Sequence, residues 1–261
     1  MFIDTHCHLT DNYVPESEIP GILERAKNAG VGGMIVVSAD PDDPQKVIKL
    51  CEKYDNLYCT VGLHPHHAGK ATPNYEHLLS HSRVLAIGEI GLDYYYGAEN
   101  RMAQIELFRA QMEIANKHGM SVAIHSRDAA DDVSEILCDP AYSNIGGTGA
   151  PGVMHCVYTN WDLTKKMLAR GFYISTSGTL TFKNKDEARD IFRMLPIDRI
   201  VIETDAPYLA PEPYRSKKCE PFMIIETAKV LAEIKNLQLG ELEIILEENT
   251  KKLYPKWHGK L

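Results

Sequence analysis

The amino-acid sequence predicts a single-domain α/β protein of the TIM-barrel class, a (β/α)8 barrel formed by residues 1–261. Three observations lead to this prediction. Short runs of apolar and β-branched residues recur along the chain, and each is followed by a turn and a longer amphipathic segment. The runs are apolar at nearly every position, which is typical of parallel strands that are covered on both faces. No linker, low-complexity tract or block of charge divides the chain, and single barrels of this class commonly take about 250 residues.

The strands are predicted from the apolar runs, of which Met34-Ile35-Val36-Val37 and Ile200-Val201-Ile202 are the clearest. Short apolar runs bounded by turn residues are consistent with strands buried in a sheet. The eight predicted strands are, in order, Phe2–His6, Gly33–Ser38, Tyr58–His64, Val84–Glu89, Ser121–His125, Gly152–His155, Gly171–Ser175 and Arg199–Asp205.

The helices are predicted from apolar residues at helical spacing. The clearest one covers Arg101–His118, and Gly119 follows it at the position where a glycine commonly ends a helix. Two further helices are predicted over Ile22–Ala29, which also ends before a glycine, and over Pro221–Asn236. The glycine- and proline-rich segment Asp139–Pro151 is interpreted as a surface loop and not as a domain boundary.

An open, doubly wound sheet shows the same alternation of strands and helices. It would place a glycine-rich phosphate-binding loop after the first strand, whereas this chain has His6-Cys7-His8-Leu9 there. The closed barrel is therefore the prediction.

Composition and charge exclude several classes of protein. Hydrophobic residues make up 44% of the chain and charged residues 25%, as in ordinary globular proteins and unlike disordered or fibrous ones. With 28 Lys and Arg against 36 Asp and Glu, the net charge is −8, which argues against broad wrapping of nucleic acid but permits a small phosphate site. Six cysteines without a CxxC pair indicate reduced thiols. Since no apolar run could span a membrane and the N-terminus lacks a signal-peptide pattern, we expect a cytoplasmic, monomeric protein that does not associate with membranes.

Histidines and carboxylates stand where the predicted strands end. Because the carboxyl ends of barrel strands meet at one mouth, residues far apart in the sequence are expected to converge there. His6 and His8 share one face of their strand, since side chains alternate along a strand. Imidazoles and carboxylates are ligands that divalent metal ions accept. The candidate metal ligands are His6, His8, Glu89, His125, His155 and Asp205, and His64 ends the third predicted strand.

Six ligands exceed the four of a single tetrahedral site. The sequence therefore predicts two divalent ions that share a bridging carboxylate, with Mg²⁺, Mn²⁺ and Zn²⁺ all as candidates. Two ions about 3.5–4 Å apart can hold the attacking and leaving oxygens of a displacement, and can lower the pKa of a bound water toward about 7.

Four segments resemble the TatD family of metal-dependent deoxyribonucleases, within the amidohydrolase superfamily. They are residues 4–8 (DTHCH), 62–66 (GLHPH), 88–94 (GEIGLDY) and 204–209 (TDAPYL). The resemblance extends from Met1 to about Leu253, and the last two segments are specific to the family. It implies a TIM barrel, a pair of divalent ions and a metal-activated water that hydrolyses DNA, commonly as a 3′→5′ exonuclease on single-stranded or frayed ends.

The resemblance also implies roles for the candidate ligands. Glu89 would bridge the two ions, and Asp205 would be both a ligand and the group that accepts the proton of the attacking water. The ligands implied for the first ion are His6, His8, Glu89 and Asp205, and those implied for the second are Glu89, His125 and His155.

Two segments depart from the family pattern. After His155 the chain reads Cys156-Val157-Tyr158-Thr159 where Cys-Phe-Ser-Gly is expected, and Cys219 stands where asparagine is usual. Both segments are expected to border the mouth, so they put the choice of substrate in question and not the metal ligands.

Side chains that could hold the substrate lie near the same strand ends. A basic loop, Arg215, Lys217 and Lys218, follows the last predicted strand, and arginine can bind a phosphate through two parallel hydrogen bonds; a merely solvated loop is the alternative. His64 is expected to donate a hydrogen bond to a phosphate oxygen, or else to pack structurally.

Two tyrosines and an aspartate are further candidates. Tyr94 and Tyr208 are expected to support a base or a nucleotide end, with lid packing as the alternative. Asp93 is expected either to orient a neighbouring histidine or to contact the substrate.

Three hypotheses for the function follow. The first is a metal-dependent deoxyribonuclease that acts on single-stranded DNA ends, with RNA as an additional substrate. The second is a related hydrolase of a small ester, amide or lactone, which would leave the basic loop idle. The third is a non-enzymatic metal-binding partner protein, which explains six converging ligands less well because structural metal sites are usually closed and four-coordinate.

Overall fold

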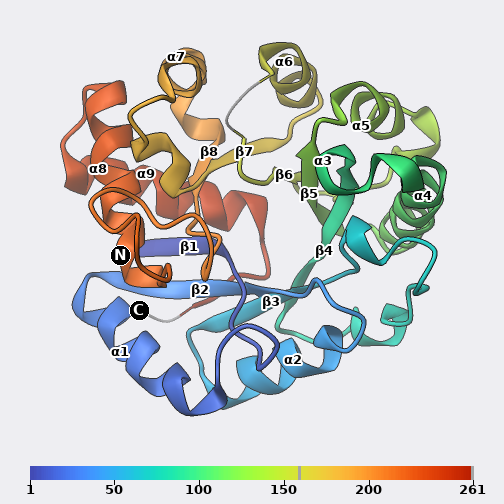
Figure 1. Cartoon of the computed structure of the whole chain (residues 1–261), viewed down its shortest axis with the longest axis horizontal. Coiled ribbons are helices and arrows are strands. Elements are labelled where there is room, and N and C mark those ends of the chain that lie inside the picture. Colours follow the sequence, from blue (N-terminus) through green and yellow to red (C-terminus); the bar gives the residue numbers. More distant parts are fainter. Residues whose placement is uncertain (158–159, 260–261) are drawn as a thin grey trace.

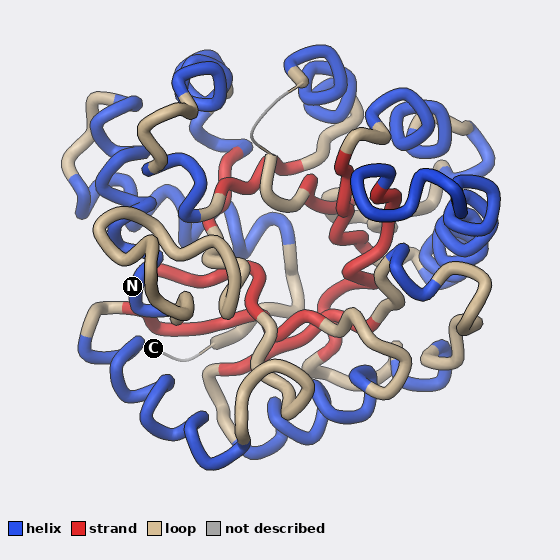
Figure 2. Tube along the Cα trace, in the orientation of Figure 1, coloured by secondary structure: helices blue, strands red, loops and turns tan. Residues whose placement is uncertain are grey.

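The computed structural model describes residues 1–157 and 160–259. Eight parallel strands follow one another in chain order, and each is hydrogen-bonded to the next. The ring closes where a parallel bridge joins Cys7, at the end of the first strand, to Ala206, beyond the last. Helices surround the strands on the outside (Figures 1 and 2). The predicted TIM barrel is confirmed.

All eight predicted strands are present, and only their ends differ from the prediction. Strands β4 and β5 run past Glu89 and His125, whereas β3, β6 and β8 stop before His64, His155 and Asp205. The strands are β1 Phe2–Cys7, β2 Val31–Val37, β3 Leu57–Val61, β4 Val84–Asp93, β5 Ser121–Arg127, β6 Gly152–Met154, β7 Tyr173–Thr176 and β8 Ile200–Ile202.

The extra length of β4 and β5 arises because their ends pair with each other. Gly91 lies opposite His125, and Asp93 lies opposite Arg127. Gly91 has a φ of 141°, and a Cβ there would lie 2.0 Å from the carbonyl oxygen of His125. Only glycine allows this close approach.

The helices include the one predicted over Arg101–His118, with identical bounds, and Gly119 ends it with a φ of 61°. The helices are α1 Ile19–Asn28, α2 Asp43–Lys53, α3 Tyr94–Gly97, α4 Arg101–His118, α5 Ala130–Leu137, α6 Trp161–Ala169, α7 Asp186–Met194, α8 Ile224–Lys235 and α9 Leu239–Leu253. The 3₁₀ turns are η1 Glu16–Glu18, η2 Pro65–His67, η3 Glu76–Leu78, η4 Ala98–Asn100, η5 Pro140–Tyr142, η6 Gly178–Thr181, η7 Ile197–Arg199 and η8 Pro221–Met223. In the described part of the chain, none of the helices combines the length and the apolar character that crossing a bilayer requires.

Side-chain alternation along the strands divides the core into an outer layer under the helices and an inner layer inside the barrel. Ile35 and Val201 belong to the inner layer, and Tyr254 and Trp257 from the C-terminal segment pack against it. Gly33, near the start of β2, makes room for this segment, since a Cβ there would lie 2.3 Å from the Trp257 ring. The C-terminal segment thus closes the amino end of the barrel, and the carboxyl end is left for a site.

Candidate metal centre

The six predicted metal ligands meet at the carboxyl end of the barrel. Four of them are buried, and His125 and Asp205 are half-buried. They come from β1 or just after it (His6, His8), from β4 (Glu89), from β5 (His125), and from the segments that follow β6 (His155) and β8 (Asp205).

The carboxylate of Glu89 lies between two groups of imidazoles. Its Oε2 is 3.4 Å from Nε2 of His6 and 3.8 Å from Nε2 of His8. Its Oε1 is 2.8 Å from Nδ1 of His125 and 3.5 Å from Nε2 of His155. One carboxylate therefore presents one oxygen to each group, which is the arrangement of a bridging ligand.

Asp205 completes the first group and is held there by the backbone. Its Oδ1 is 3.5 Å from Nε2 of His8 and 3.8 Å from Nε2 of His6. Its amide donates to the carbonyl oxygen of His6 at 2.9 Å, and its φ of 59° lies in the left-handed region, which aspartate tolerates better than most residues. Asp4 secures the preceding residue, because its carboxylate accepts hydrogen bonds from the amide, at 2.9 Å, and from the hydroxyl of Thr204.

The donor atoms fit a divalent metal ion. Nε2 of His6 is buried and has no hydrogen-bond partner among the described residues. His8 donates from Nδ1 to the carbonyl oxygen of Val37 at 3.1 Å, which leaves the lone pair of its Nε2 for a metal. The distances from Nε2 of His6 and of His8 to the carboxylate oxygens of Glu89 and Asp205 are 3.4–3.8 Å, which is too long for hydrogen bonds. Ligands bound at about 2.1 Å in a tetrahedron, by contrast, lie about 3.4 Å apart.

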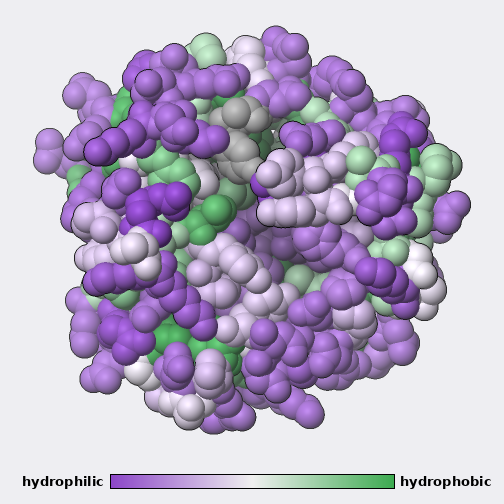
Figure 3. Space-filling view, in the orientation of Figure 1, coloured by the Kyte–Doolittle hydropathy of each residue, from purple (hydrophilic) through white to green (hydrophobic). Residues whose placement is uncertain are grey.

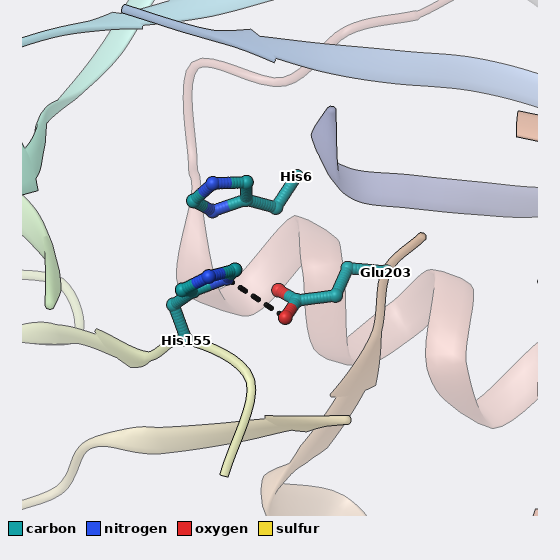
Figure 4. A group of neighbouring side chains, drawn as sticks. All are labelled: His6, His155 and Glu203. Atoms are coloured by element: carbon teal, nitrogen blue, oxygen red, sulfur yellow. Dashed lines mark ion pairs between the residues drawn. The ribbon is translucent and has the colours of Figure 1, made fainter. Parts of the chain in front are cut away.

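Glu203 holds His155 of the metal centre and was not predicted from the sequence. It lies one residue past β8, and its Oε1 is 2.8 Å from Nδ1 of His155. Figure 4 shows the two side chains paired. Ser175 on β7 donates to its other oxygen at 2.7 Å, and the His155 ring stacks on the ring of His6 with centroids 3.7 Å apart. A carboxylate on the far nitrogen of a ligating histidine orients the ring and increases its basicity. Strand alternation was the available signal, because residue 203 has the same parity as the inward-facing Val201.

Burial and mutual charge set the protonation of the centre. Burial alone would raise the pKa of Glu89, but the imidazoles of His155 and His6 hold it well below its ordinary value. Burial would lower the pKa of His155, but Glu203 and Glu89 raise it to about 10. The carboxylates bonded to His125 likewise overcome the effect of burial and raise its pKa to about 9. These imidazoles hold protons near neutral pH, so binding of a cation must release them.

Asp93 orients His125 from the side opposite Glu89. Its Oδ2 lies 3.1 Å from Nε2 of His125, which is the first of the two roles expected for it. The same carboxylate caps α3 by accepting from the amide of Tyr96 at 3.1 Å. Gln104 on α4 holds the Asp93 backbone, accepting from its amide at 2.8 Å and donating to its carbonyl oxygen at 2.9 Å.

His64 lies beyond β3, in the loop that leads into η2, and not in the strand as predicted. Its Nε2 is 3.9 Å from Oε1 of Glu89. Its Nδ1 accepts from the amide of His66 at 3.2 Å, and burial lowers its pKa well below the ordinary value. The ring is therefore neutral with its proton on Nε2, which makes it a hydrogen-bond donor toward the centre and supports the predicted contact with a phosphate oxygen.

A cavity of about 680 Å³ opens over the metal centre, and the face of the molecule in Figure 3 is hollowed near its middle. Tyr208 lines it, and its contact with a base or nucleotide end stays a prediction. Among the described residues, its wall also carries two cations that the sequence analysis missed, Arg127 and Lys185. Arg127 stands two residues after His125 on β5, so alternation could have indicated it. Lys185 lies just before α7, where no sequence signal marks it.

The basic loop contacts the cavity wall, and none of its three cations is among the described lining residues. The guanidinium of Arg215 stacks 3.6 Å from the ring centroid of Phe182, and Lys218 donates to the carbonyl oxygen of Tyr13 at 2.9 Å. Phe182 and Tyr13 themselves line the cavity. Arg215 and Lys218 thus make contacts to the wall, and a contact of Arg215, Lys217 or Lys218 with phosphate stays a prediction.

Tyr94 also lies outside this lining in the described structure. Its hydroxyl donates to Asp132, which pairs with Arg101 as well. All three residues line a neighbouring cavity of about 510 Å³. Because α3 turns at this point, Tyr96 lines the main cavity instead.

The two departures from the family pattern lie in different surroundings. Cys156 lines the cavity, and its Sγ lies 3.1 Å from the hydroxyl of Ser177. The side chain of Cys219 is buried and is not among the described lining residues, and its amide donates to the carbonyl oxygen of Pro207 at 3.1 Å. Tyr158 and Thr159 lie outside the described residues.

Comparison with known proteins gives a consistent result. The model of the family described as TatD related DNase matches residues 3–255. YabD of Bacillus subtilis, an uncharacterized metal-dependent hydrolase, is 34% identical over 97% of this chain and 99% of its own. YcfH of Escherichia coli, also an uncharacterized metal-dependent hydrolase, is 32% identical over 97% of this chain and 96% of its own.

Solved structures show the same likeness. YjjV, a TatD homolog from Escherichia coli, superposes with a TM-score of 0.86 at 27% identity, covering 97% of this chain and 98% of that one. A TatD-family hydrolase from Entamoeba histolytica superposes with a TM-score of 0.82 at 25% identity, covering 97% of both chains.

Proposed function

Because the chain belongs to the TatD-related DNase family of metal-dependent hydrolases, we propose that it cleaves phosphodiester bonds of DNA, as a 3′→5′ exonuclease on single-stranded or frayed ends. The observation that carries the proposal is the carboxylate of Glu89, which presents one oxygen to each of two histidine groups. This arrangement favours a pair of divalent ions. Arg127 and Lys185 on the cavity wall above favour an anionic substrate.

Divalent ions held by these groups would supply Lewis-acid stabilisation of charge and a more acidic water. The implied ligands are His6, His8, Asp205 and Glu89 for one ion and Glu89, His125 and His155 for the other.

The side chains around the centre would accept the proton of the attacking water and bind the phosphate. Burial would raise the pKa of Asp205, but the nearby imidazoles of His8, His155 and His6 hold it below its ordinary value. Asp205 is therefore ionised and able to take the proton of the attacking water. His64 donates from Nε2 to a phosphate oxygen, and Arg127 and Lys185 offset the charge that develops on the phosphoryl group.

The test is an assay of metal-loaded protein on end-labelled oligonucleotides: single-stranded, duplex, RNA, and blocked at either end. We expect stepwise release of mononucleotides from the 3′ end of single strands, and protection by a 3′ block. Cleavage at internal bonds would show that the protein is an endonuclease and not an exonuclease. Efficient cleavage of esters or lactones with no release of nucleotides would establish the small-molecule hydrolase instead.

Asp205→Asn tests the proton acceptor. We expect kcat to fall by about a hundredfold or more with an unchanged circular dichroism spectrum, the scale of a general base. His118→Asn is the matched control, because His118 lies on α4 and pairs with Glu76 outside the cavity lining. Retention of most activity in folded, metal-loaded Asp205→Asn would assign the proton to another group.

A further inference from the structure

An aromatic cluster stands at the rim of the cavity, formed by Tyr95 and Tyr96 of α3 and Arg127 of β5. Tyr95 and Tyr96 are 59% and 62% exposed. Their rings meet edge to face, with centroids 4.7 Å apart. The guanidinium carbon of Arg127 lies 3.9 Å from the centroid of Tyr95 and 4.8 Å from that of Tyr96. We call these three residues the tyrosine platform.

The exposure of these rings is unusual for this chain. Among the described Phe, Trp and Tyr side chains, only Tyr95, Tyr96 and Tyr208 are exposed. Tyr96 and Tyr208 both line the cavity over the metal centre. A tyrosine ring left in water forgoes the free energy that burial would provide, so the gathering of exposed rings at one mouth indicates a surface that a ligand covers.

The platform is connected to the metal centre by direct contacts. The ring of Tyr96 packs edge to face on His66, with centroids 5.7 Å apart, and His66 packs on His64 at 4.3 Å. Arg127 follows His125 by two residues on the same strand. A group bound on Tyr96 would therefore lie in the same cavity as the candidate metal ligands.

We propose that the tyrosine platform is the subsite that stacks a nucleobase of single-stranded DNA, with Tyr96 as the ring that faces the base. This inference rests on the proposed nuclease function. Unpaired bases stack on aromatic rings and on guanidinium planes, with little dependence on sequence. The guanidinium of Arg127 stacks on the ring of Tyr95, and this contact keeps it over the rings of Tyr95 and Tyr96.

The platform also determines which form of DNA fits. A base inside a duplex is stacked on both faces by its neighbours, so it offers no free face to Tyr96. A single strand or a frayed end provides such bases, whereas an intact duplex offers only the outer face of its terminal pair. The subsite therefore selects for unpaired ends by stacking and not by reading the base edges.

The test compares metal-loaded wild type with Tyr96→Ala and Tyr96→Phe. For a single-stranded oligonucleotide we expect Tyr96→Ala to raise KM about tenfold with little change in kcat, and Tyr96→Phe to stay near wild type. Ile244→Ala, at another exposed apolar residue on α9, is the control for the loss of surface area.

Oligonucleotides with a single abasic nucleotide, moved one position at a time, locate the stacked base. At one position the missing base should raise the KM of the wild type and leave that of Tyr96→Ala unchanged. An oligonucleotide KM that Tyr96→Ala leaves unaltered, or a wild type that is indifferent to an abasic nucleotide at every position, would overturn the platform while the nuclease stands.

Binding of a fluorescein-labelled single strand, measured by anisotropy with chelator present so that no hydrolysis occurs, separates the two proposals. Binding that depends on Tyr96 but is followed by no cleavage after metal is restored would support the platform and overturn the nuclease. Absence of both binding and cleavage would overturn both.

Discussion

Glu203 is a fully enclosed carboxylate with a partner on each oxygen. One oxygen pairs with Nδ1 of His155 at 2.8 Å, and the other accepts from Ser175 at 2.7 Å. Its charge is one of the causes that keep the pKa of His155 raised. Glu203 thus acts on the candidate metal centre through His155, by fixing which nitrogen of that ring faces Glu89.

Replacement of Glu203 by glutamine keeps the shape of the side chain and removes its charge. We expect Glu203→Gln to lower metal affinity by about ten- to a hundredfold, since the partners of ligating histidines contribute on this scale. Competition with a chelating dye measures the affinity. Glu76→Gln is the matched control, because Glu76 pairs with Lys117 and His118 at the surface. If Glu203→Gln binds metal as tightly as the wild type, then Glu203 only packs in the core and does not affect metal binding.

At the scale of elements, helix α4 holds two loops of the site through a pair of buried glutamines. Gln104 and Gln111 lie two turns apart and so face the same way. Gln104 bonds both backbone groups of Asp93, and it donates to the carbonyl oxygen of Gly97 at 2.9 Å. Gln111 accepts from the amide of Leu63 at 2.8 Å and donates to its carbonyl oxygen at 2.9 Å. The segment before His64 and the segment that carries the tyrosine platform are therefore both positioned by one helix.

Gln104→Leu would leave the backbone groups of Asp93 and Gly97 without these partners. Each buried unpaired group costs about 1–3 kcal/mol, so we expect the free energy of unfolding to fall by at least about 2 kcal/mol. Because Asp93 also orients His125 and caps α3, KM for a single strand should rise as well. Urea unfolding and steady-state kinetics measure the two effects.

The control for Gln104→Leu is Glu106→Leu, at an exposed position of the same helix. A surface change of this kind alters stability by about 0.5 kcal/mol or less. An equal loss of stability in both variants would show that the leucine itself, and not the lost hydrogen bonds, is responsible.

At the scale of the whole molecule, the chain has a net charge of −8 and is proposed to bind a polyanion. Such a surface repels DNA on average, so attraction has to be concentrated where cations line the cavity. Arg127 and Lys185 are there, over the metal ligands. The proposed substrate should therefore contact the protein through very few phosphates.

The dependence of affinity on salt counts those phosphates. Each phosphate of a single strand that is neutralised contributes about −0.7 to the slope of log affinity against log salt concentration. We expect a slope of about −1.5 to −2 at saturating metal, and a slope smaller in magnitude by about 0.7 for Lys185→Ala. Lys229→Ala, on α8 and paired with Glu226, is the control. A wild-type slope of about −4 would mean that the DNA strand follows the outer surface. A change of the slope in Lys217→Ala would show that the basic loop contacts the DNA strand.

The strands and the convergence of the candidate metal ligands could be predicted from the sequence because both follow from local geometry. An apolar run bounded by turn residues forms a strand in any barrel, and the carboxyl ends of barrel strands always meet. His6, His125 and Asp205 therefore converge although they lie far apart in the chain. The same alternation would have indicated Glu203 and Arg127, which have the parity of Val201 and His125.

The amino-acid sequence by itself thus determined the barrel, its strand order and the residues able to hold metal. The resemblance implied the bridging place of Glu89, and only the tertiary structure decided that Arg215 packs on Phe182 of the cavity wall and that Tyr96 and Lys185 line the cavity. The physical reason is that a strand side chain is directed by its own backbone, whereas a side chain on a loop is directed by whatever the loop packs against. In this chain such contacts can come from segments distant in the sequence, as when Arg215 packs on the ring of Phe182.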